Sequence, residues 1–188
     1  MYIYNLIYIT YYISTSCILE RFGRIVYTKY MHFILYENMI GFPEFGIQIP
    51  VRNDRVSRTI EELSQNPDTD AKLREHLDRQ VRETITKDDL LRVHDPAYVE
   101  RLYSPAADEA LKEAYELVDE EGNYHRYDPS EARYPLSGLF DQALLRTAGT
   151  LQCARSALAE RFAFFFSGGM HHAHAGFGHG FCPINDTV

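Results

Sequence analysis

The stretch that decides the fold is Phe162-Ala163-Phe164-Phe165-Phe166-Ser167-Gly168-Gly169-Met170-His171-His172. Residues 162–166 are an apolar run rich in aromatic side chains, which is typical of a strand buried on both faces of a parallel sheet. Such a strand needs helices on either side, and ligands of open α/β sheets bind beyond the carboxyl ends of the strands. The stretch therefore predicts an α/β fold with a functional site at His171 and His172.

A second block follows after a short loop and reads Gly180-Phe181-Cys182-Pro183-Ile184-Asn185-Asp186. The two blocks and the interval between them resemble the active-site segment of the histone deacetylase family, including its bacterial deacetylase-like branch. Weaker agreement extends upstream through the helix expected near Ser137, the segment His94-Asp95-Pro96-Ala97-Tyr98-Val99, and Phe45 to Pro50 followed by Ser57-Arg58-Thr59. The resemblance covers roughly residues 31–188. It implies an arginase/deacetylase-like fold, a parallel sheet flanked by helices, truncated at its C-terminal side.

The resemblance also implies a chemistry, the hydrolysis of an N-acetylated amine such as acetyl-lysine or a small acetylated polyamine. Hydrolysis of an amide at a metal needs a base for the proton of water and an acid for the leaving amine. Imidazole suits both tasks because its pKa lies near neutrality. The resemblance assigns them to His171 and His172 as a general acid/base pair.

Three further residues receive substrate-binding roles from the resemblance. Gly180 is expected to present its backbone carbonyl near the leaving amine, and Phe181 to form one wall of the tunnel for the methylenes of lysine. Asp128, on a polar loop ahead of the last helix, is expected to hold the backbone of the acyl-lysine. Asp128-Pro129-Ser130 is equally a simple turn signal. Asn185 and Asp186 are expected to fix the loop rather than to touch substrate.

The Zn²⁺ that the resemblance implies has no ligand set in this sequence. In the family an Asp-x-His pair on the next strand and a later Asp hold the metal, so the ligands are expected beyond Val188. A catalytic zinc ion needs three protein ligands. We therefore expect the 188-residue chain to be inactive by itself, and to fold poorly because a partial sheet exposes an apolar edge.

Another interpretation of the histidines is a non-catalytic one. His171, His172, His174 and His179 lie close together and could form an exposed patch or an adventitious transition-metal site. The alternatives to the deacylase are therefore a metal-binding or interaction protein and a truncated product without function. Zinc binding that is lost on replacing His174 and His179, but kept on replacing His171, would favour the metal-binding protein.

Composition narrows the class of protein and its partners. With 188 residues, 45% hydrophobic and 24% charged, the chain is ordinary globular material. The net charge is -8, whereas proteins that bind nucleic acid usually have a broad basic surface. We therefore predict no direct contact with nucleic acid. Three cysteines without a CxxC pair indicate reduced thiols and a cytoplasmic enzyme. We predict Cys153 to lie in the core and Cys182 not to be a nucleophile. The sequence does not indicate an oligomeric state.

The N-terminal segment, residues 1–30, is predicted to be an extension outside the working domain, which would comprise residues 31–188. Residues 1–19 are uncharged and long enough to span a membrane. Five tyrosines and several polar residues interrupt them, however, and no Lys or Arg precedes them as in a signal peptide. We therefore predict no membrane segment, with Met31 as the natural start and a first buried strand from His32 to Tyr36.

The remaining chain is predicted to be mostly helical. Helices are expected at about 54–65, 70–81, from Thr86, at 97–103, 106–119 and 137–160. The last of them spaces Phe140, Leu144, Leu151 and Leu158 along one face, which we expect to pack on the sheet. His94 is expected to be a structural, hydrogen-bonding residue rather than a ligand.

Overall fold

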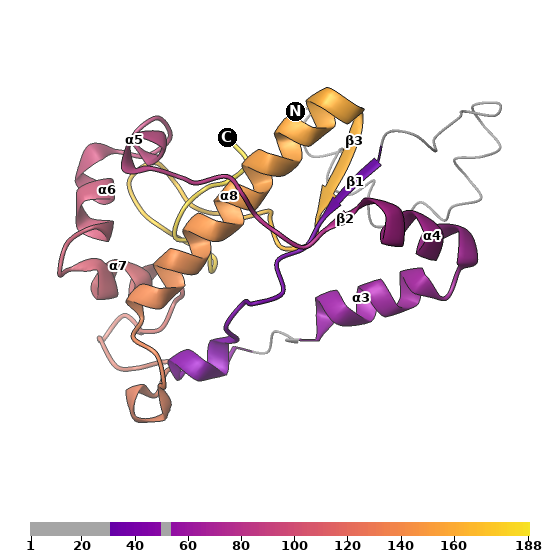
Figure 1. The fold of residues 1–188 in the computed structure, drawn as a ribbon. Coiled ribbons are helices and arrows are strands. Elements are labelled where there is room, and N and C mark those ends of the chain that lie inside the picture. The colour runs from indigo at the N-terminus through magenta and orange to yellow at the C-terminus, as the bar shows by residue number, and fades with distance from the viewer. Residues whose placement is uncertain (1–30, 50–53) are drawn as a thin grey trace. The chain divides into compact units, whose positions relative to one another are not determined.

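A small parallel sheet organises the protein in a computed structural model that describes residues 31–49 and 54–188 (Figure 1). Strand β1 (Met31–Ile34) lies between β2 (Leu77–Asp78) and β3 (Phe162–Phe165) and is parallel to both. Met31 is opposite Phe162, and Ile34 is opposite Phe165. The predicted α/β class with a parallel sheet is confirmed. The first strand exists, although it ends two residues before the predicted Tyr36.

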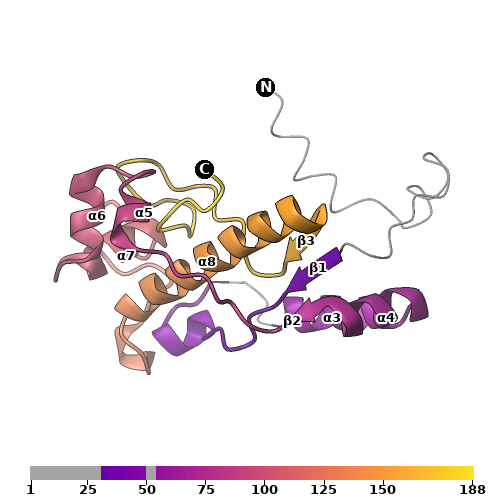
Figure 2. The ribbon, with the colours of Figure 1, turned by 45° about the horizontal axis from the view of Figure 1, so that its top comes forward.

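Helices connect the strands and flank the sheet. They are 3-10 helix η1 (Phe42–Phe45), α3 (Arg55–Ser64), α4 (Pro67–His76), α5 (Lys87–Leu90), α6 (Pro96–Leu102), α7 (Ala107–Ala114), 3-10 helix η2 (Pro129–Glu131) and α8 (Ser137–Glu160). In both views α8 lies along one side of the sheet and α4 along the other (Figures 1 and 2). Helix α5 begins directly after the predicted Thr86, its N-cap, whose Oγ1 accepts a hydrogen bond from the Asp89 N–H at 3.3 Å.

Two predicted helices have different bounds in the structure. The helix expected over 70–81 begins at Pro67, because the Asn66 side chain caps it, and it ends at His76. Leu77 and Asp78 then pair with β1, a contact distant in sequence that helical periodicity does not reveal. The helix expected over 106–119 ends at Ala114, since Glu116 has a left-handed φ of 56°.

The prediction that β3 is buried on both faces is wrong. Phe162 is 41% exposed, and the other β3 residues are half-buried. Among the described residues β3 pairs with β1 only, so it is an edge strand, and α8 covers one of its faces. On that face the Phe165 ring packs directly on the backbone of Gly149 in α8. Leu158 is 89% exposed because no described element covers that side of the last turn of α8.

The main core lies between α6, α7 and the first half of α8. Residues of the final segment contribute to it, although that segment lacks helices and strands: Met170, Ala173, Cys182 and Ile184 are all buried. Cys153 was predicted to lie in the core, but in the structure it is only half-buried. None of the helices in the described ranges has the length and apolar character needed to cross a membrane. The prediction on residues 1–30 lies outside the described residues.

Candidate active site

The histidine pair lies just beyond the carboxyl end of β3, as predicted. His171 and His172 are both exposed, and their ring centroids are 4.1 Å apart at an interplanar angle of 39°. The preceding Ser167-Gly168-Gly169 turn leads the chain out of the sheet. The two imidazoles therefore lie against each other and are exposed to solvent, near the edge of the sheet where α/β proteins bind ligands.

The hydrogen bond of His171 fixes the position of its proton. Nδ1 lies 2.8 Å from the carbonyl oxygen of Gly169. A carbonyl oxygen only accepts hydrogen bonds, so Nδ1 must carry the hydrogen. In the neutral ring the lone pair then lies on Nε2, away from the backbone. His171 is thereby prepared to take a proton at Nε2.

The second block lies against His172 through a tight turn. The backbones of His179 and Cys182 are joined by two hydrogen bonds of 3.1 and 3.0 Å. The two central residues, Gly180 and Phe181, have φ of 57° and 64°, the signature of a type I′ turn. A Cβ on Gly180 would lie 2.9 Å from Cβ and Cγ of His172. Glycine is therefore needed both for the turn and for the close approach.

Phe181 adopts a conformation that is costly for an aromatic residue, by roughly 1–3 kcal/mol. Its N–H donates to the carbonyl of Ala114 at 3.0 Å, and its half-buried ring packs on the core. The structure thus brings Gly180, Phe181 and His172 together. The roles of Gly180 and Phe181 toward a substrate remain predictions.

Asp128 is used within its own turn. Its Oδ1 accepts hydrogen bonds from the Ser130 N–H at 2.9 Å and the Ser130 hydroxyl at 2.6 Å, which caps η2. These bonds hold the pKa of the Asp128 carboxyl below its usual range. The Asp128 N–H also donates to Gly46 at 2.8 Å. These contacts are those of a simple turn, which is one of the two interpretations of this segment. The substrate-binding role of Asp128 stays a prediction.

Asp186 is hydrogen-bonded to the glycine turn that precedes the histidine pair. It is 8% exposed, and its Oδ2 accepts from the Thr150 hydroxyl at 2.8 Å and from the Gly169 N–H at 3.1 Å. Oδ1 is buried without a hydrogen-bond partner among the described residues. Burial raises the pKa of this carboxyl. The predicted structural role of Asp186 fits these contacts. Its partner Thr150 was missed because a threonine on a helix carries no local signal for a bond so distant in sequence.

Replacing Asp186 with Asn should change how stability depends on pH. A carboxyl whose pKa is raised by folding stabilises the protein fully below its unfolded pKa, and this contribution is lost as the pH rises through the folded value. The free energy of unfolding of the wild type, relative to Asp186→Asn, should therefore fall across the range between the ordinary and the raised pKa. Urea unfolding at a series of pH values measures this difference. A difference that does not vary with pH would show that folding does not raise the pKa of Asp186.

The described residues do not fit a catalytic zinc ion. They contain no group of three or more His, Cys, Asp or Glu that could hold a metal. The His174 ring stacks on Phe177 with 4.4 Å between centroids, and it is 6.2 Å from the ring of His179. Cys182 is buried, and burial raises the pKa of its thiol.

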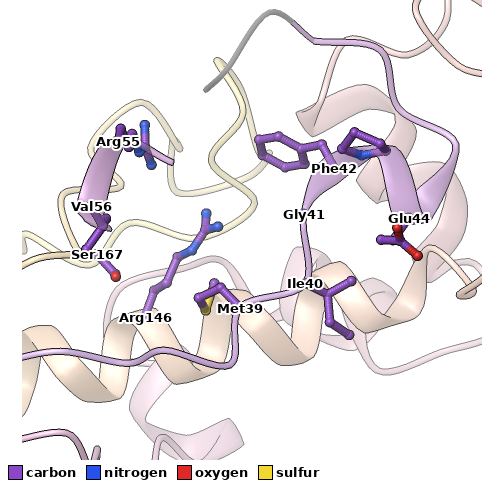
Figure 3. Close-up of a pocket in the computed structure, with 10 residues that line it drawn as sticks. Met39, Ile40, Gly41, Phe42, Glu44, Arg55, Val56, Arg146 and Ser167 are labelled. Carbon is purple, nitrogen blue, oxygen red and sulfur yellow. The ribbon is translucent and has the colours of Figure 1, made fainter. Parts of the chain in front are cut away.

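A cavity of about 260 Å³ lies between residues 39–44, the start of α3 and α8 (Figure 3). Residues 39–44, Arg55, Val56, Arg146 and Ser167 line it. Arg146 extends into it from α8, and Ser167 is part of the turn that precedes the histidines. Neither His171 nor His172 lines the cavity, so it is separate from the histidine pair.

Comparison with known proteins identifies the chain. Residues 49–188, most of the chain, match the family model of the histone deacetylase domain. Together with the parallel α/β sheet, this match defines a domain of the deacetylase-type hydrolases. The chain belongs to the histone deacetylase family.

A solved structure and the curated proteins were also compared. The crystal structure of the HDA15 HD domain is similar with 21% identity and a TM-score of 0.46, over 85% of this chain and 41% of that chain. The present chain thus spans less than half the length of that structure. No curated protein matches the sequence.

Proposed function

We propose that residues 31–188 form the part of a cytoplasmic, zinc-dependent deacylase that carries its acid/base pair, and that the substrate is an N-acetylated amine such as acetyl-lysine. The observation that supports this proposal is the pair of exposed rings 4.1 Å apart, with the Nδ1–H of His171 committed to Gly169. One neutral ring can take the proton of the attacking water, and the other, protonated, can donate to the amine nitrogen as the C–N bond breaks.

The neighbouring residues would orient the substrate. Phe181 supplies an apolar wall for the methylenes of lysine, and the carbonyl of Gly180 accepts a hydrogen bond from the leaving amine. Asp128 binds the backbone of the acyl-lysine from its loop. Because the described residues hold no zinc-binding group, we propose that the 188-residue chain alone does not turn over substrate. Direct contact with nucleic acid forms no part of the proposal.

Acetate release tests this function. The protein isolated from its native cells and the purified 188-residue chain are each supplied with Zn²⁺ and either an acetyl-lysine peptide or an acetylated polyamine. The native protein should release acetate from at least one substrate, whereas the chain alone should release none. A native protein without activity on both would contradict the deacylase, and turnover by the isolated chain would contradict its proposed inactivity.

A further inference from the structure

The segment His94-Asp95-Pro96-Ala97-Tyr98 has no part in the function proposed above. It comprises the last two residues of the turn between α5 and α6 and the first three residues of α6, and in both views this part of the chain lies beside the final loop (Figures 1 and 2). His94 is only 3% exposed. It therefore cannot meet a substrate, and its role must lie in what its ring holds in place.

The ring of His94 bridges the two blocks of the candidate active site. Nδ1 lies 2.9 Å from the carbonyl oxygen of His174 and 3.3 Å from that of Ala175. Nε2 accepts the N–H of Asn185 at 3.1 Å. Since carbonyls accept and an N–H donates, the ring must be neutral with its hydrogen on Nδ1. Both nitrogens are therefore satisfied in one tautomer only.

Asn185 carries the connection on to the histidine pair. Its Nδ2 donates to the carbonyl of His171 at 3.3 Å and to that of Ala173 at 3.1 Å. Its Oδ1 accepts from the N–H and the hydroxyl of Thr187 at 3.1 and 2.9 Å. The amide is thus fully oriented. Only Asn185 separates the His94 ring from the backbone of His171.

Asp95, the N-cap of α6, and Tyr98 in its first turn make further bonds to the same loop. The Asp95 N–H donates to the carbonyl of Ala175 at 2.9 Å, and the buried Tyr98 hydroxyl donates to that of Pro183 at 2.6 Å. The rings of His94 and Tyr98 pack edge to face at 5.7 Å. Asp95 and Tyr98 therefore add two further hydrogen bonds to the irregular final segment, beside its bonds to Ala114 and Thr150.

We propose that His94 is a positioning residue for the His171–His172 pair. Through Asn185 it fixes the backbone of His171, and this keeps the His171 Nδ1–H on Gly169 and leaves Nε2 available. The inference rests on the proposed function only for the purpose of the pair; the hydrogen-bond chain itself is independent of it. A residue in this role affects the orientation of His171 and not merely the stability of the fold.

The test uses long-range ¹H–¹⁵N correlation spectra of the imidazoles in the 188-residue chain. In the wild type, both His94 and His171 should show the hydrogen on Nδ1. His94→Phe keeps a ring but removes both bridging bonds, and His171 should then lose its Nδ1–H signature. Asn185→Asp removes the donor to the carbonyls of His171 and Ala173 with little change in shape, and it should produce the same loss even if His94→Phe does not fold.

Tyr98→Phe is the matched control, because it removes a buried hydrogen bond of the same turn without touching the chain from His94 to His171. It should lower stability yet leave the His171 signal unchanged. The proposal is overturned if wild-type His94 carries its hydrogen on Nε2, if either histidine of the wild type lacks an ordered signal, or if His171 is unaffected in Asn185→Asp.

Turnover adds a second measurement that separates the two proposals. In the native protein His94→Phe should lower kcat on the order of 10²-fold with little change in KM, as expected for a misplaced acid/base group. If the spectra change as expected but the native protein has no deacylase activity, the positioning role stands and the proposed function fails. If the spectra of the variants do not change but the native protein is active, the positioning role fails and the proposed function stands.

Discussion

Replacing His171 or His172 with Asn in the native protein should lower kcat by roughly 10²–10⁴-fold, the usual contribution of a general acid or base. The asparagine amide at position 171 can still donate to the Gly169 carbonyl, which Nδ1 now contacts at 2.8 Å. The substitution therefore removes Nε2 and leaves the local backbone intact. KM should change little, because neither ring is proposed to bind the acyl-lysine in its ground state.

The double variant and a distant histidine complete this experiment. Because the two rings act as a unit, His171→Asn with His172→Asn should lose less than the product of the single losses. His76→Asn, at the end of α4, is the control and should keep full kcat. Steady-state kinetics on an acetyl-lysine peptide measures all four variants. A loss below tenfold in both single variants would show that the pair is not the acid/base pair.

Gly46→Ala should produce the largest loss of stability from a single added methyl group. Gly46 follows η1 with a left-handed φ of 73°, which costs an L-residue roughly 1–2 kcal/mol. A Cβ there would also overlap the carbonyl oxygen of Asp128, a backbone atom that cannot move away alone. Overpacking of this kind adds about 1–3 kcal/mol. The free energy of unfolding should fall by the sum of both effects.

Gly122→Ala separates the two effects. Gly122 has a similar φ of 83°, but nothing lies within 4 Å of the position of its Cβ. It should therefore lose only the conformational part, and urea unfolding should rank wild type above Gly122→Ala and Gly122→Ala above Gly46→Ala. Equal losses in the two variants would contradict the packing of the Asp128 segment on Gly46.

Local patterns in the sequence predicted most of the fold. The parallel strand at Phe162, the long helix from Ser137 and the helix start at Thr86 are all present, because apolar periodicity and capping residues act over a few residues. Strand β2 was missed since it exists only through pairing with Phe33 and Ile34. The burial of β3 was overestimated, because a run of phenylalanines does not indicate how many strands pair with it.

The sequence indicated which residues to place in the candidate site, but not the contacts that support them. The two blocks indicated His171, His172, Gly180 and Phe181, and the structure brings them together around the type I′ turn. The roles of His94 and Thr150 depend on bonds across 91 and 36 residues of sequence. No local pattern encodes such contacts. For Asp128 the sequence alone could not decide between two roles, because a turn and a substrate-binding site both favour an aspartate at this position.

The most direct test of the whole account is the intact mass of the native protein, captured from its cells with an antibody against residues 137–188 and measured under denaturing and native conditions. The account predicts a polypeptide well above 21.8 kDa, of about 250–300 residues as for a complete α/β domain, that retains one zinc ion under native conditions. A polypeptide at or below 21.8 kDa without zinc would contradict it, because the histidine pair would then have no metal centre to work with.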